Sequence, residues 1–232
     1  MHYFPPTRLL GSLLEKEIFP KYGGLAGKRI LDAASGEGYH SDCFRDAGAE
    51  VFPIDLSPSP QRNASKADVT ALPFPGRSFD FVFSSQLLEH LPFEDFGKAL
   101  SEYGRVLRPE GRIILTVPLK GPLGYWASDI GHAGPEKHRN TFETGADFDR
   151  LAGAYLEKDE SFGYQGFAGT VLMASLMGAH RILSGKSHSS QGEILPPPEI
   201  YKRAFESVLP LLEKESASAK NPQAYCYVGK KS

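Results

Sequence analysis

KRILDAASGEGYHSD, residues 28–42, is the stretch that decides the fold. An apolar strand ends on Asp32, and a turn of small residues then leads into a segment that can begin a helix. Gly36 and Gly38 let the backbone approach a ligand closely, because neither carries a Cβ atom. The new helix offers unpaired N–H groups and its positive dipole end to a negative group. The stretch therefore predicts a strand–turn–helix unit that holds a nucleotide-like cofactor.

The composition argues against several classes of partner. Hydrophobic residues make up 41% of the 232 residues, which suits a packed α/β domain. The 26 basic and 28 acidic residues leave a net charge of −2, so no electrostatic feature favours nucleic acid or an anionic membrane. Cys43 and Cys226 have no metal-ligand spacing and predict reduced thiols. With no signal peptide and no long apolar stretch, we expect a cytoplasmic protein without a metal site.

Apolar runs alternate with helical periodicities over residues 28–118. The expected strands are 28–33, 51–55, 65–69, 79–83 and 113–117, and the expected helices include 38–47 and 94–107. Strands that alternate with helices over short links are typical of an α/β fold with a doubly wound, mostly parallel sheet and helices on both faces. Later strands at 156–162 and 224–228, the last one antiparallel, would bring the sheet to seven strands.

The flanking segments complete a single expected domain, 1–232. Leucines at helical spacing predict an amphipathic helix at 7–19, ended by Pro20, that packs on the sheet or covers the cofactor mouth. Residues 119–143 are rich in Gly, His and aromatics and follow the carboxyl end of a strand, where substrate-contacting loops occur. The expected parts are an N-terminal cap (1–27), a cofactor-binding core (28–118), a substrate-side loop (119–143) and a C-terminal half (144–232). Helices are expected in this last part at 144–155, 167–184 and 199–214.

Five motifs occur in order along 28–118. They are LDAASGEG at 31–38, FPIDLS at 52–57, ADVTALPF at 67–74, SFDFVFSSQLLEHL at 78–91 and LRPEGRIILTVP at 107–118. Together they resemble the class I S-adenosylmethionine-dependent methyltransferases, and most closely the small-molecule (type 11-like) group. The resemblance implies a Rossmann-like methyltransferase fold, S-adenosyl-L-methionine as cofactor and S-adenosyl-L-homocysteine as product.

The resemblance also implies roles for particular residues. The turn at 32–38 would hold the methionyl end of the cofactor, the carboxyl ends of the next strands would hold the ribose and adenine, and the fourth strand would line the path to the substrate. The turn residues are Asp32, Ala34, Ser35, Gly36 and Gly38. The ribose and adenine residues are Asp55 for the ribose hydroxyls, Leu56 for the adenine, and Asp68 and Val69 for the adenine edge. The residues that line the path to the substrate are Ser84 and Gln86. The position of Asp55, about 20 residues beyond the glycine turn, independently suits a ribose contact. Ala34 departs from the family, which has glycine there.

No base for the acceptor is obvious within 28–118, so we look to the loop that follows. A hydroxyl acceptor needs a base of near-neutral pKa, for which histidine is suited. His132 and His138 are the candidates, with His90 as a third, and Tyr125 and Trp126 could form an apolar wall. We therefore expect O-methylation of a small or glycan-like acceptor by a monomer or homodimer.

Two other functions fit the same strand–turn–helix unit. A nicotinamide-dependent oxidoreductase is disfavoured because the third small position is Ser41 and because such enzymes do not need the block at 67–91. A non-catalytic member could bind the cofactor or a partner protein through the same fold. Binding of S-adenosylmethionine would indicate the methyltransferase, and binding of NAD would indicate the oxidoreductase.

Overall fold

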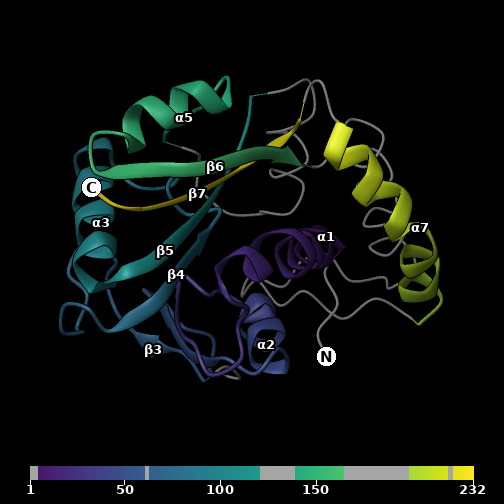
Figure 1. Ribbon diagram of the computed structural model, residues 1–232, viewed down its shortest axis with the longest axis horizontal. Coiled ribbons are helices and arrows are strands. Elements are labelled where there is room, and N and C mark those ends of the chain that lie inside the picture. The colour runs from purple at the N-terminus through teal and green to yellow at the C-terminus, as the bar shows by residue number, and fades with distance from the viewer. Residues whose placement is uncertain (1–4, 61–62, 121–138, 165–198, 219–221) are drawn as a thin grey trace.

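A seven-stranded sheet runs through the molecule in the order β3-β2-β1-β4-β5-β7-β6 (Figure 1). The computed structural model describes residues 5–60, 63–120, 139–164, 199–218 and 222–232. The strands are β1 Arg29–Ala33, β2 Glu50–Asp55, β3 Ser65–Lys66, β4 Phe79–Ser85, β5 Leu107–Pro118, β6 Leu156–Tyr164 and β7 Ala224–Lys231. Pairing is parallel from β3 to β5, whereas β7 runs antiparallel to both β5 and β6. The predicted doubly wound, mostly parallel sheet is confirmed.

Helices cover both faces of this sheet (Figure 1). They are α1 Pro5–Leu13, the π-helix η1 Leu14–Ile18, the 3₁₀-helix η2 Phe19–Tyr22, α2 Tyr39–Asp46, α3 Phe93–Val106, α5 Gly145–Ala152 and α7 Glu199–Ser218. Side chains of α3 and α5 share one buried cluster with the sheet, and those of α1 and α2 share the other. Among the helices that the structure describes, none has the length and apolar character that crossing a bilayer requires.

The register of the central strands brings several strand ends to one edge. Leu31 of β1 lies opposite Phe52 of β2 and Val82 of β4. A strand between two others with helices on both faces needs apolar side chains, which explains the pair Ile30–Leu31 in KRILDA. In this register Ala33 pairs with both Ile54 and Ser84. The residues that follow these three therefore meet at the carboxyl edge of the sheet.

Several predicted boundaries differ from the structure, and three of the differences concern the elements around the site. Pro20 does not end the N-terminal helix, because it lies in the first turn of η2, where a helix needs no N–H, and Gly23 with φ 85° ends the segment instead. Strand β5 begins at Leu107 rather than 113, since it pairs with Phe79 ahead of a bulge. Strand β3 is limited to Ser65–Lys66. The helix predicted at 167–184 lies outside the described residues.

The N-terminal segment packs against the sheet, as one of the two interpretations of its leucines predicted. Leu10, Leu14 and Ile18 belong to the same buried cluster as Phe81 and Phe83. The ring of Phe19 lies 5.4 Å from that of Phe81 in an edge-to-face arrangement. This segment thus supplies one hydrophobic face of the cofactor-side strands.

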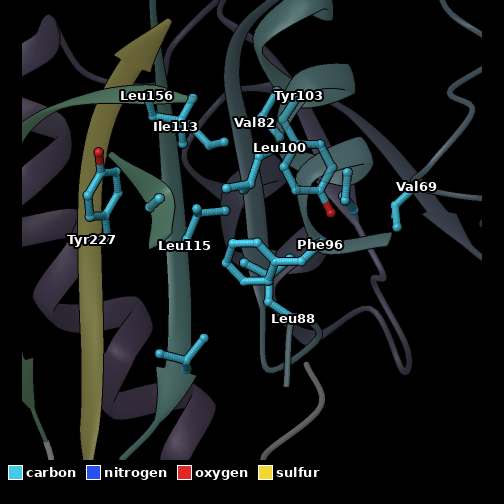
Figure 2. Close-up of a cluster of buried hydrophobic side chains, with 14 of the residues drawn as sticks. Val69, Val82, Leu88, Phe96, Leu100, Tyr103, Ile113, Leu115, Leu156 and Tyr227 are labelled. Atoms are coloured by element: carbon cyan, nitrogen blue, oxygen red, sulfur yellow. The ribbon is translucent and has the colours of Figure 1, made fainter. Parts of the chain in front are cut away.

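The other face is filled by side chains of α3 and the central strands. Figure 2 shows Leu100 and Phe96 of α3 against Val82 of β4 and Leu115 of β5. Leu88, from the turn after β4, lies beside Phe96. This packing fixes the turn that follows β4.

Leu100→Ala is expected to lower the free energy of unfolding by about 2–5 kcal/mol, because a fully buried side chain would leave a cavity. Urea unfolding followed by circular dichroism measures the loss. Leu211→Ala is the matched control: this side chain is 68% exposed on α7, and the expected change is under about 0.5 kcal/mol. Equal, small losses at both positions would contradict the packing described here.

Candidate functional site

The turn between β1 and α2 has a left-handed backbone at three positions. Ala34 has φ 64°, Gly36 φ 49° and Gly38 φ 71°. The Ser35 N–H donates to the carbonyl of Ile54 at 2.9 Å, which anchors the turn to β2. A Cβ atom built at Gly36 would meet no protein atom within 4 Å. The turn therefore presents bare backbone to open space at the edge of the sheet.

Asp55 ties this turn to the end of β2. One carboxylate oxygen accepts the N–H of Gly36 at 3.0 Å, and the other accepts the N–H of Ser57 at 2.9 Å. Leu56, which follows Asp55 in the sequence, leaves 63% of its surface exposed. An anionic carboxylate and an exposed apolar side chain thus lie next to the bare backbone at Gly36. This arrangement suits a ligand that carries both hydroxyl groups and an apolar ring.

Asp32 lies beneath the turn rather than at its surface. It is 2% exposed, and its carboxylate accepts a hydrogen bond from the Ser41 hydroxyl in the first turn of α2. Burial raises the pKa of Asp32 to about 6, although the Ser41 hydrogen bond opposes the shift. The carboxyl is thus half-titrated near pH 6 and gains its charge more easily when a cation approaches.

Asp68 and Val69 lie in the segment that follows β3. One carboxylate oxygen of Asp68 accepts both the N–H and the hydroxyl of Thr70, at 2.8 and 2.7 Å. Val69 is buried and belongs to the cluster on the α3 face. The hydrogen bonds hold Asp68 in one orientation, as a contact with a ligand edge would require.

Ser84 and Gln86, at the end of β4, differ in their surroundings. Ser84 is buried, and its hydroxyl accepts a hydrogen bond from Tyr103 of α3 at 3.2 Å. Gln86 adopts a left-handed backbone with φ 54°, and its N–H donates to the carbonyl of Thr116 at 3.0 Å. Ser84 therefore faces the core, whereas Gln86 turns the chain out of the sheet at the edge.

Comparison with known proteins identifies the fold family. Residues 31–115 match the family described as methyltransferase domain. A malonyl-[acyl-carrier protein] O-methyltransferase of Pseudescherichia vulneris is 35% identical over 115 residues, which cover 46% of this chain and 45% of that protein. A ubiquinone biosynthesis O-methyltransferase of Aeromonas salmonicida is 30% identical over 146 residues, 56% of this chain and 58% of its own. The chain thus spans about half the length of the curated relatives it matches.

A solved structure supports the same fold. The S-adenosylmethionine-dependent methyltransferase of Archaeoglobus fulgidus aligns with a TM-score of 0.57 at 16% identity, over 97% of this chain and 94% of that one. The match at residues 31–115, these relatives and this fold together support the resemblance to the class I S-adenosylmethionine-dependent methyltransferases. S-adenosyl-L-methionine is the cofactor of this class.

The described residues fit that cofactor. The methyltransferase domain leaves space at Gly36 and an exposed leucine next to Asp55, as a nucleoside with a ribose and a flat base requires. His40, in the first turn of α2, packs on Phe83 with ring centroids 4.7 Å apart, and desolvation lowers its pKa to about 3. Its imidazole is therefore neutral and adds no positive charge near a sulfonium.

Of the three histidines predicted as acceptor contacts, the structure describes only His90. His132 and His138, with Tyr125 and Trp126, lie outside the described residues. His90 is described: its Nε2 lies 3.9 Å from Oε1 of Glu89. Among the residues that the structure describes, no cluster of His, Cys, Asp or Glu could hold a metal ion.

Glu89 is a site feature that the sequence did not indicate. Its side chain is fully buried in the turn after β4, and no other described residue donates a hydrogen bond to either carboxylate oxygen. Desolvation raises the pKa of Glu89 to about 8, with its own backbone N–H opposing the shift. A glutamate in the run LLEHL carries no sequence signal of burial, so only the tertiary structure reveals it.

The strain at Ala34 gives a stability prediction. A left-handed alanine costs about 1–2 kcal/mol, whereas a glycine there costs about 0.4–1 kcal/mol of extra chain entropy. Ala34→Gly should therefore change the free energy of unfolding by between zero and about +1 kcal/mol. The control Ala99→Gly, in the buried interior of α3, should instead lose about 1 kcal/mol or more. Equal losses at both positions in urea unfolding would argue against the left-handed turn.

The raised pKa of Asp32 gives a pH prediction. Because the folded state holds the proton more tightly than the unfolded state, stability falls as pH rises from about 4 to about 6. Asp32→Asn removes this titration, so its free energy of unfolding relative to wild type should rise by up to about 3 kcal/mol across that range. Urea unfolding at several pH values measures the difference.

Ser41→Ala is the control for that experiment. It keeps the carboxyl but removes the hydrogen bond that lowers its pKa, so the pH dependence should persist and steepen. A difference between Asp32→Asn and wild type that stays constant with pH would contradict the burial of this carboxyl.

Proposed function

We propose that the chain transfers a methyl group from S-adenosyl-L-methionine to an oxygen atom of a small-molecule acceptor, glycan-like molecules included. The observation that carries the proposal is the Asp55 carboxylate, hydrogen-bonded to the glycine turn beside an exposed leucine. The cofactor supplies a methyl group that its sulfonium already activates. The protein then has to bind the cofactor and the acceptor, orient them in line and exclude water. It needs no covalent nucleophile.

Each residue at the edge has a task in this proposal. The free lone pairs of the Asp55 oxygens accept the two ribose hydroxyls, and Leu56 covers one face of the adenine. Asp68 accepts the adenine amino hydrogens, with the Val69 N–H beside it. Asp32, beneath the turn, balances the charge of the methionyl ammonium, and Ala34, Ser35, Gly36 and Gly38 surround its carboxylate. Ser84 supports Gln86, which borders the path to the acceptor.

The acceptor lies on the side of the edge that follows β4 and β5. The names of two relatives specify transfer to oxygen, which favours an oxygen acceptor here. His132 and His138 are the candidates from sequence for contacts with that acceptor, and His90 borders the same edge. A non-catalytic protein that binds the cofactor or a partner is the second candidate function.

Calorimetric titration with S-adenosylmethionine, S-adenosylhomocysteine and NAD tests the cofactor. We expect binding of the first two, and a loss of about 10–100-fold in Asp55→Ala, because a charged hydrogen-bond acceptor contributes about 1.5–3 kcal/mol. Asp55→Asn, which keeps one acceptor oxygen for the turn, should lose less. Asp46→Ala, an exposed carboxyl at the end of α2, should bind as wild type does.

Other outcomes would redirect the assignment. Binding of NAD alone would indicate an oxidoreductase. Binding of S-adenosylmethionine with no release of S-adenosylhomocysteine in any hydroxyl or carboxyl acceptor screen would favour the non-catalytic function.

A further inference from the structure

Glu89 is a buried carboxyl for which the fold supplies no described hydrogen-bond donor. Such a group costs several kcal/mol unless a partner arrives, so buried carboxyls without partners are concentrated at functional sites. The backbone around it is by contrast well satisfied. The carbonyl of Glu89 accepts the N–H groups of Arg139 and Asn140 at 2.7 and 2.9 Å. The backbone at Glu89 is thus fixed, while both carboxylate oxygens are buried without a hydrogen-bond partner.

The turn that carries Glu89 is clamped from several directions. The Asn140 side-chain amide donates to the carbonyls of Leu88 and Leu91, at 3.0 and 2.8 Å. Leu88 is buried in the core beside Phe96 (Figure 2). The backbone that carries the carboxyl is thus held on both sides of Glu89. This rigidity suits a group that must meet an incoming atom at a defined place.

The carboxyl lies among the polar side chains at the ends of three strands. The Tyr164 hydroxyl, at the end of β6, hydrogen-bonds Thr116 of β5 and Gln86 after β4. Burial raises the pKa of Tyr164, and the nearby Glu89 carboxyl adds to the shift. Ser85 and Thr116 share a further hydrogen bond at 2.8 Å. The titratable side chains that the structure places beside Glu89 are His90, from the same turn, and Tyr164. These groups lie at the edge next to Gln86, on the acceptor side.

We propose that Glu89 is the general base for the acceptor, taking the proton of its hydroxyl as the methyl group is transferred. This inference rests on the proposed function. The acceptor oxygen forms its bond to the methyl carbon while the methyl–sulfur bond breaks and sulfur keeps the electron pair. The hydroxyl proton passes to a carboxylate oxygen of Glu89, and it leaves to solvent after the methylated product departs. No oxidant or further reactant is needed.

Protein labelled with [5-¹³C]glutamate tests the protonation of Glu89 without turnover. We expect one resonance, absent from Glu89→Gln, that titrates with a midpoint near 8 in the complex with S-adenosylhomocysteine and shifts when catechol is added. A Glu89 midpoint near the ordinary glutamate value of about 4.3 would overturn the assignment. So would a resonance that saturating catechol leaves unchanged.

Transfer to catechol and to 4-nitrocatechol tests the base role. The nitro compound is ionised near neutral pH and needs little help from a base, whereas catechol needs deprotonation. For wild type, transfer to catechol should rise with pH and level off above about 8. Glu89→Gln should lose about 100-fold or more with catechol and less than about 10-fold with 4-nitrocatechol. Glu94→Gln, an exposed residue in the first turn of α3, is the matched control and should behave as wild type.

The outcomes separate this inference from the proposed function. Equal losses for both acceptors would mean a structural role for Glu89 and would overturn the assignment. A wild-type protein that methylates neither acceptor would count against the proposed O-methylation. In that case the carbon-13 midpoint and its response to catechol would still decide whether Glu89 meets an acceptor hydroxyl.

Discussion

Two backbone N–H groups donate to the carboxylate of Asp55, and the geometry of the cofactor edge depends on this pairing. The N–H of Gly36 belongs to the turn after β1, and that of Ser57 follows β2. One side chain thereby fixes the ends of two parallel strands relative to each other. Because the same carboxylate keeps lone pairs toward open space, the group that shapes the edge is also the one suited to bind a ribose.

Burial changes the pKa values of the titratable side chains below the carboxyl edge of the sheet, and so changes the charges that a bound cofactor would meet. Desolvation raises the pKa of Asp32 to about 6 and lowers that of His40 to about 3, so each group loses its charge more readily than it would in water. Desolvation likewise raises the pKa of Glu89, in the turn after β4, to about 8. A bound cation therefore gains more from the ionised carboxyl of Asp32 than it would in water.

The cofactor side of the site follows from local sequence, and the acceptor side does not. The apolar run before Asp32, the small residues of the turn and the spacing to Asp55 are local signals, so the sequence predicts the strand, the turn and the helix. The burial of Glu89 depends on Asn140, about 50 residues away, which clamps the turn around it. The inward orientation of Ser84 depends likewise on Tyr103. At Pro20 a local rule gives a wrong prediction. Proline is expected to end the N-terminal helix, but a new helical turn begins there.

The place of β7 in the sheet has a consequence for how the protein emerges from the ribosome. Strand β7, residues 224–231, inserts between β5 and β6, and β6 pairs only with it in the described sheet. During synthesis β5 and β6 are both complete while the strand that joins them is still unmade. Their unpaired edges stay open to other chains until residues 224–231 arrive. Closure of this part of the sheet therefore waits for β7, and β6 is secured only when β7 has been made.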